Sequence, residues 1–303
     1  MWTLLRRRTP LGWLQLRHER GRFLVALAGI AFADLLIFAQ LGFQAALYDS
    51  NTSFNRALKG DLVLLSPQAR NLQNLSTVPR RRLYQALDVP GVAEGTALYI
   101  RSLRWWNPQT LRTATVQLVG FDPAADMFRL PEVEAQRHRL TVANAVLFDR
   151  HARGAYDTVI ARVDRGERVS TELDRQTLTL AGLFTLGASF GADATVLSSA
   201  QTFHRLVPGQ GPGSVSLVVL TLRPGADPDL VLRQLRGHLP DDVRVLTAAE
   251  YVRFEESYWR SASPIGVIFG VGTAMALVVG VVIVYLVLST DVASHLGEYA
   301  TFR

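Results

Sequence analysis

The sequence predicts an α+β domain inserted between two transmembrane α-helices. Two apolar runs of 25 residues each, Phe23–Leu47 and Pro264–Leu288, lie near the two ends of the 303-residue chain. The stretch between them holds short β-rich runs bounded by Gly, Pro and Asn, together with a few helical segments. Mean hydropathy is positive and 49% of the residues are hydrophobic, which fits a few apolar spans plus one folded domain.

Each apolar run is long enough to cross a bilayer. At about 1.5 Å per residue, 25 helical residues reach about 37 Å, more than the hydrocarbon core of about 30 Å. Pro264 suits the first turn of the second helix. A cleaved signal peptide is the alternative for the first run, but its apolar region would be only about 7–15 residues long, and Ala45-Ala46 is a poor cleavage site. We therefore expect the first run to be retained.

The placement of arginine predicts the orientation. Six arginines precede the first span, whereas Asp49 and Asn51 follow it, so the N-terminus should be cytoplasmic. Two crossings then return the C-terminus to the cytoplasm, in a multi-pass protein of the inner (plasma) membrane. Tyr258 and Trp259 precede the second span, either as interfacial aromatics or as packing of the domain. The predicted parts are a basic N-terminus at 1–22, spans at 23–47 and 264–288, a periplasmic α+β domain with a stalk helix at 48–263, and a cytoplasmic segment at 289–303.

Alternation and turn residues predict the elements of the domain. Asn107-Pro108 marks a turn between two strands, and Asp227-Pro228 marks a helix start. Strands are expected at Asp61–Ser66, Ala97–Trp105, Ala114–Phe121, Thr177–Leu186, Thr195–Ser198 and Ser214–Leu222, and helices at Arg80–Leu87, Asp229–His238 and Ala248–Trp259. The last helix should run nearly continuously into the second span. Gly209–Gly213 reads as a flexible loop at a subdomain boundary.

Composition excludes several classes of function. The net charge of +6 comes from scattered arginines, with Lys59 the sole lysine, so no basic stripe predicts nucleic-acid binding. The absence of cysteine rules out disulfides, thiolate metal sites and a cysteine nucleophile. No Walker A pattern occurs, so we expect no cofactor in this chain, and any ATP is bound by a partner subunit.

Two further sequence patterns bear on whether the chain has a catalytic or metal site. Gly187–Gly191 matches G-x-S-x-G around Ser189, but a nucleophile elbow needs a helix after the serine, and the following residues read as a strand. A glycine-rich β-hairpin is the preferred interpretation, and a serine hydrolase is the alternative. The histidines show no metal-ligand spacing: His18, His138, His151, His204, His238 and His295. We expect neither a metal site nor an enzyme.

Polar residues interrupt the first span. Asp34 lies at its middle, where a lone carboxylate costs several kcal/mol unless it is paired, protonated or facing a polar cavity. It serves either as a substrate or proton contact or as a hydrogen-bonding group to a neighbouring helix, and in both cases it should face protein. Gln40 and Gln44 add polarity one helical turn apart.

Small residues mark one face of the second span. Gly266 and Gly270 form a G-x-x-x-G pair, and Ala274 extends it by a turn. Such a face lets two helices approach closely. Together with Asp34, it predicts an assembly of more than two helices.

Several segments resemble one transporter family. The chain is similar to DevC-type permeases of the MacB/FtsX-like class of ABC transporters, and the likeness covers essentially the whole chain. The segments that carry it are Leu11–Leu16, Leu24–Asp34, Gln40–Gln44, Ala46–Ser50, Gly60–Pro67, Glu256–Gly270 and Asp291–Thr301.

The resemblance implies a permease subunit that works as a dimer and has a MacB-periplasmic-core-like domain. It implies a separate ABC ATPase, a periplasmic adaptor (membrane fusion) protein and, indirectly, an outer-membrane channel as partners. ATP-driven motion would pass through the membrane to the periplasmic domains, with export of a glycolipid or another hydrophobic cargo. The alternative, from a different class, is a two-span anchored periplasmic binding or sensor module.

The segment after the second span resembles the family's cytoplasmic coupling helix. On that match Asp291, His295, Glu298 and Tyr299 would contact the ATPase, and the alternative is an ordinary polar flank. Members of the family continue through two more membrane helices, whereas this sequence stops at Arg303. The expectation is a fragment, a frameshifted product or a split subunit.

Overall fold

The computed structural model describes residues 20–173 and 175–299, in two compact units. The membrane unit contains the described residues up to Ala46 and those from Ser263 onward. The domain runs from Leu47 to Ala262. Each unit has its own internal packing.

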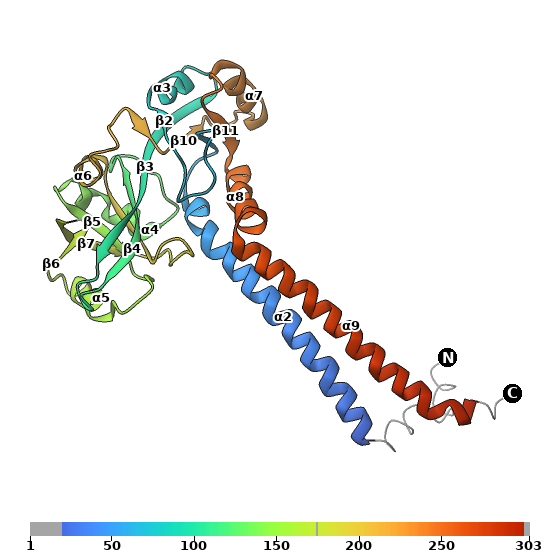
Figure 1. The fold of residues 1–303 in the computed structure, drawn as a ribbon. Helices are drawn as coiled ribbons and strands as arrows, with labels where there is room; N and C mark the ends of the chain where they lie inside the picture. Colours follow the sequence, from blue (N-terminus) through green and yellow to red (C-terminus); the bar gives the residue numbers. More distant parts are fainter. Residues whose placement is uncertain (1–19, 174, 300–303) are drawn as a thin grey trace, which may run out of the picture. The chain divides into compact units, whose positions relative to one another are not determined.

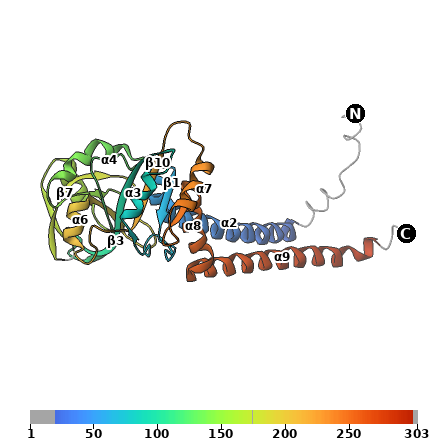
Figure 2. The same cartoon turned by 90° about the horizontal axis from the view of Figure 1, so that it is seen from above.

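The membrane unit is a pair of long helices, α2 (Arg20–Ala57) and α9 (Pro264–Tyr299), which lie side by side in Figures 1 and 2. The last turns of α2, from Leu47 on, belong to the domain. Two described segments, Leu27–Ala57 and Pro264–Thr290, are long and apolar enough to cross a membrane. Their side chains are almost entirely exposed, whereas the core helix of a soluble protein would be mostly buried. This apolar surface requires lipid or further protein around it.

In its described part, the domain is built on a nine-stranded mixed sheet in the order β11-β1-β10-β3-β4-β8-β5-β7-β6. A small two-stranded sheet joins β2 to β9. The strand bounds are β1 Leu62–Leu65, β2 Val78–Pro79, β3 Val92–Trp106, β4 Thr113–Phe121, β5 Ala145–Asp149, β6 Val169–Leu173, β7 Gln176–Phe184, β8 Ala194–Ser199, β9 Ser214–Val215, β10 Leu217–Leu222 and β11 Arg244–Thr247.

The long strand β3 connects two lobes of the domain. Its first half pairs with β10 in an antiparallel sheet that continues through β1 to β11, here called the sheet lobe. Its second half pairs with β4, and its end pairs again with β6, where Trp105 lies opposite Leu173. Strands β3, β4, β8, β5, β7 and β6 therefore close on themselves as a barrel lobe.

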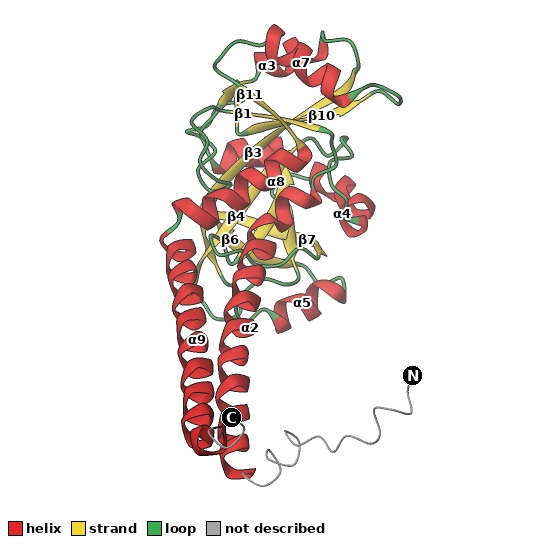
Figure 3. Cartoon of the chain, turned by 90° about the vertical axis from the view of Figure 1, so that its right-hand side faces the viewer, coloured by secondary structure: helices red, strands yellow, loops and turns green. Residues whose placement is uncertain are grey.

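Helices cover the lobes, as Figure 3 shows. Their bounds are α3 Arg81–Leu87, α4 Pro131–Gln136, the 3₁₀ turn η2 Arg137–Thr141, α5 Asp157–Asp164, α6 Ala200–Leu206, α7 Pro228–His238, α8 Ala248–Ser257 and the π-helical turn η3 Tyr258–Ala262. Helices α3 and α7 lie together on the sheet lobe. The predicted start of α7 is confirmed, since the Asp227 side chain accepts a hydrogen bond from the Asp229 N–H.

The side chains of the strands divide into two cores, as the alternation of a pleated strand requires. In β1, Leu62 and Leu64 join one cluster, whereas Val63 and Leu65 join the other. Trp105 and Phe148 stack in the first cluster with ring centroids 5.1 Å apart. These two cores place the helices on both faces of the sheet.

The predicted fold class is confirmed: a mixed α/β domain is flanked by two apolar helices. All six predicted strands are present, and the Ser214–Leu222 run is split into β9 and β10. The sequence analysis missed β2, β5, β6 and β11, which are only two to five residues long. The hairpin predicted between Thr177–Leu186 and Thr195–Ser198 is wrong, because β5 lies between β7 and β8 and pairs with both.

Candidate functional site in the membrane unit

A polar contact ties α2 to α9 within the membrane unit. Gln40 Nε2 donates a hydrogen bond to the Phe269 carbonyl oxygen at 3.1 Å. Thr273 Oγ1 donates to the same oxygen at 2.9 Å, one turn further along α9. The carbonyl oxygen therefore accepts from a side chain of each of the two helices. Gln40 thus contacts a neighbouring helix, and Gln44 is half-buried.

Three glycines allow the two helices to approach each other closely. A Cβ at Gly272 would lie 2.8 Å from Gln40 Nε2, and one at Gly29 would lie 3.1 Å from Ile283 Cγ2. At Gly280 the corresponding distance to Ala33 Cβ is 3.7 Å. Sequence reasoning did not select these glycines. The signal was available in the two-turn spacing of Gly272 and Gly280 on α9.

The predicted small-residue face of α9 is exposed at two of its three positions. Gly266 is buried, but Gly270 and Ala274 are exposed, and a Cβ at Gly270 would meet no atom within 4 Å. The part of the face formed by Gly270 and Ala274 is therefore open. Its role in packing against another helix stays a prediction.

Asp34 lines an open groove between α2 and α9. The groove has a volume of about 450 Å³, and its other lining residues are Ile30, Ala33, Ile37, Leu277, Gly280, Val281, Val284, Tyr285 and Leu288. The Asp34 side chain is exposed and makes no hydrogen bond or ion pair with any described residue. A carboxylate at this depth of a membrane needs a polar partner. The two helices alone do not supply one from their described side chains.

The predicted coupling residues Asp291, His295, Glu298 and Tyr299 all lie in the last two turns or so of α9. Their side chains fall outside the described part of the structure. Their contact with an ATPase therefore stays a prediction.

In the domain, Glu255 connects α8 to a loop that is distant in sequence. The side chain is fully buried. Its Oε2 accepts from the Leu72 N–H at 2.8 Å, and its Oε1 accepts from Trp259 Nε1 at 2.8 Å, in the π-helical turn. Burial raises the pKa of Glu255 to about 7, although both hydrogen bonds act to lower it. Trp259 is itself buried, so the domain-packing interpretation of this ring is correct.

The Gly187–Gly191 segment forms a tight turn without a nucleophile elbow. The Ser189 N–H donates to the Ala192 carbonyl at 2.9 Å, and Ser189 Oγ accepts from the Ala192 N–H at 3.0 Å. Strand β8 follows, so the helix that an elbow requires does not occur here. The buried Asp149 holds the start of the loop by accepting from the N–H groups of Leu186 and Gly187. Among the described residues, no group of three His, Asp or Glu side chains could hold a metal ion.

Comparisons with known proteins give likenesses of structure only. No protein-family model matches the sequence, and no curated protein matches it. Among solved structures, the periplasmic region of MacB from Actinobacillus actinomycetemcomitans is 9% identical with a TM-score of 0.44, covering 66% of this chain and 94% of the other. The extracellular domain of the noncanonic ABC-type transporter YknZ from Gram-positive bacteria is 10% identical with a TM-score of 0.40, covering 61% and 99%.

A domain of a candidate permease from Porphyromonas gingivalis is 18% identical with a TM-score of 0.35, covering 64% of this chain and 89% of the other. The three structures are described as the periplasmic region of MacB, the extracellular domain of an ABC-type transporter and a domain of a permease. With TM-scores below 0.5, they carry no inference about individual residues. The function of this chain therefore has to follow from its own residues.

Proposed function

We propose that this chain is a permease subunit of an ABC-type exporter, energised by a separate ATPase. The observation that carries the proposal is the incomplete membrane unit. Two exposed apolar helices hold Asp34 in an open groove, and no described side chain pairs with it. A carboxylate in hydrocarbon must be completed by another helix or by a bound cation or donor. A mere anchor for the domain would have no need of such a group.

The open surface of α9 has the spacing of a helix-packing seam. Gly270 and Ala274 are followed on the same face by groove residues Leu277, Val281, Val284 and Leu288, in alternating steps of four and three. This repeat keeps one face of a helix turned toward a partner over five turns. A helix laid along the seam would cover the small residues and the groove together. We infer that a second copy, or further membrane helices, occupies it.

The partners follow from what the sequence lacks. No Walker A pattern occurs in the chain, so a transporter built from it takes ATP from another subunit. The proposed topology places both termini in the cytoplasm, where Asp291, His295, Glu298 and Tyr299 would contact that ATPase. The domain would contact a periplasmic adaptor that leads to an outer-membrane channel. The proposed cargo is a glycolipid or another hydrophobic molecule.

Site-specific photocrosslinking in native membranes tests the ATPase contact. A benzophenone amino acid replaces Tyr299 in one variant and the exposed Tyr84 of α3 in the control. We expect the Tyr299 variant alone to yield an adduct that contains a P-loop ATPase by peptide mass fingerprint. A two-span binding or sensor module gives no such adduct. Its absence, with a normal amount of protein in the membrane, contradicts the proposal.

A further inference from the structure

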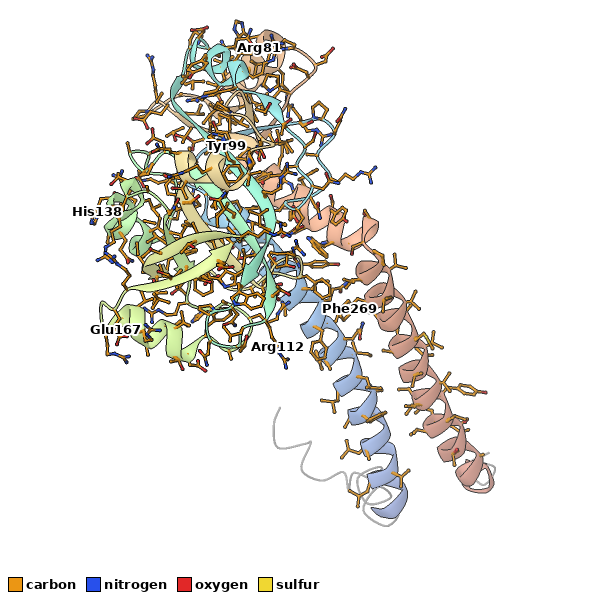
Figure 4. The ribbon with its side chains drawn as sticks, turned by 60° about the vertical axis from the view of Figure 1, so that its left-hand side comes forward. Arg81, Tyr99, Arg112, His138, Glu167 and Phe269 are labelled. Atoms are coloured by element: carbon orange, nitrogen blue, oxygen red, sulfur yellow. The ribbon has the colours of Figure 1, made fainter. Side chains whose placement is uncertain are left out.

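A cavity of about 490 Å³ lies in the domain where β3 passes from the sheet lobe to the barrel lobe. Its wall includes Arg80 just before α3 and His204 of α6, and from β3 it includes Gly95, Thr96, Ala97 and Tyr99. The size is that of a small-molecule site, for which about 300–1,000 Å³ is usual. Tyr99 of this wall and Arg81, the neighbour of Arg80, are marked in Figure 4.

Arg80 is the cation of this cavity, and its charge is unpaired. Its guanidinium makes no hydrogen bond or ion pair with any described residue, and Nε is buried without an acceptor. Two residues later, Arg82 binds Asp242 through Nε at 2.9 Å and Nη2 at 2.7 Å. A buried N–H without an acceptor is destabilising, so an anion that reaches Arg80 would relieve that cost.

The backbone and an aromatic ring hold Arg80 in place. Its N–H donates to the Gly213 carbonyl at 2.8 Å, as an extension of the β2–β9 pairing. Its Cζ lies 6.0 Å from the centre of the Tyr84 ring. The guanidinium is thus positioned without a carboxylate, which is the arrangement expected of a residue that binds an external anion.

The other polar groups of the wall are donors or are already engaged. Tyr99 O–H donates to the Pro212 carbonyl at 3.3 Å, and burial raises the pKa of Tyr99, so the phenol stays neutral. His204 Nδ1 lies 3.0 Å from the Gln210 carbonyl oxygen; since that oxygen can only accept, Nδ1 carries the proton. Asp122 is the single carboxylate of the described wall, and its Oδ1 accepts from the Ala124 N–H.

The loop beside the cavity is fixed from within. Gln210 is buried, and its Nε2 donates to the Ser214 carbonyl and to Ser216 Oγ, each at 3.2 Å. This loop contributes Pro212 to the wall. The glycine run 209–213, predicted to be a flexible loop, is therefore organised around one buried amide. Apolar side chains, among them Leu83 and Ala200, make up much of the remaining wall.

We propose that this cavity binds a small amphipathic ligand, whose carboxylate or phosphate group contacts Arg80 and whose apolar part lies against Leu83 and Ala200. The inference does not rest on the proposed exporter function, since it concerns the domain alone. It assigns to the domain a binding site of defined chemistry.

Calorimetry on the full chain in phosphatidylcholine nanodiscs tests the site, with hexyl phosphate, inorganic phosphate and hexanol as probes. We expect hexyl phosphate to bind saturably and more tightly than either of the other two. Arg80→Gln should weaken it at least tenfold, whereas Arg81→Gln, a change of the exposed neighbour, should not. Lack of saturable binding, or equal weakening by both changes, overturns the proposal. Equal affinity for inorganic phosphate overturns the amphipathic assignment and identifies a free anion as the ligand.

A second variant tests the site without changing Arg80, in case Arg80→Gln loses binding through a folding defect. Ala200→Phe keeps Arg80 and places a ring in the cavity, at a half-exposed position. We expect it to abolish hexyl phosphate binding while leaving uptake of the probe by the nanodisc lipid unchanged. Unaltered binding to Ala200→Phe overturns the location of the site.

Discussion

The domain and the membrane unit treat their carboxylates in opposite ways. Asp149 and Glu255 are fully buried in the domain, and each accepts at least two hydrogen bonds from groups of the same chain. Asp34, in the membrane unit, has none among the described residues. The domain thus folds around its own polar groups, whereas on the proposed function the membrane unit would receive a partner at Asp34. Substitutions in each unit test this difference.

The largest effect is expected from Glu255→Gln. The pKa of Glu255 is raised from 4.5 to about 7, so the folded domain holds the proton more tightly than the unfolded chain. Its contribution to stability is therefore greatest at low pH and falls as the pH rises from about 4.5 to 7, by up to about 3 kcal/mol. In Glu255→Gln, the free energy of unfolding should no longer fall over this pH range. Denaturant titrations at pH 5, 6, 7 and 8, followed by tryptophan fluorescence, measure it.

Glu256→Gln is the matched control for that experiment. Glu256 is half-buried and accepts from Arg56 Nη2 at 3.2 Å, without the enclosure of its neighbour. We expect this variant to keep the pH dependence of the wild-type free energy of unfolding. If that pH dependence were also unchanged in Glu255→Gln, Glu255 would not be the residue that takes up a proton on folding.

The next effect concerns the approach of α2 to α9. Gly272→Leu adds a side chain against Gln40 and should destabilise the packing of α2 against α9 by about 1–3 kcal/mol through overpacking. Gly270→Leu should leave that packing unchanged, because a Cβ at residue 270 meets no atom within 4 Å. The packing can be measured by disulfide cross-linking of a Gly29→Cys/Ile283→Cys pair. Because the chain has no cysteine of its own, no other disulfide within the chain interferes. Cross-linking should fall in Gly272→Leu and persist in Gly270→Leu; the reverse result would place α2 on the other face of α9.

Particular residues show what the sequence could and could not predict. Long runs such as Ala114–Phe121 predicted strands because alternation and β-branched residues are local signals. Strand β5 was missed because five residues carry too little pattern, and its insertion between β7 and β8 depends on long-range pairing. The burial of Glu255 depends on Leu72, 183 residues away, which no periodicity of α8 reveals. Likewise, the unpaired state of Arg80 and the pairing of Arg82 follow from tertiary contacts alone.

Asp34→Leu should act on assembly rather than on the single chain. Because Asp34 has no partner among the described residues, its loss should leave membrane insertion unchanged, together with the disulfide cross-link of the Gly29→Cys/Ile283→Cys pair. Interhelical polar contacts in membranes contribute about 0.6 kcal/mol each, at most about 1.7. We expect a weaker association between copies, measured by energy transfer between labelled chains in vesicles, and loss of export where the complete transporter is reconstituted. Unchanged assembly and export would exclude a role for this carboxylate.

Gln40→Leu should give the smallest effect, and it sharpens the contrast with Asp34. It removes the hydrogen bond to the Phe269 carbonyl, but that oxygen keeps Thr273 Oγ1 as a donor, so no acceptor is left bare. The expected loss is about 0.6 kcal/mol in the α2–α9 association, visible as a two- to threefold shift in the cross-linking equilibrium. Association between copies should not change, because Gln40 is used inside the pair. If Gln40→Leu instead weakened association between copies as much as Asp34→Leu, the two residues would serve the same interface. Gln40 would then not be a contact within one chain that differs in role from Asp34.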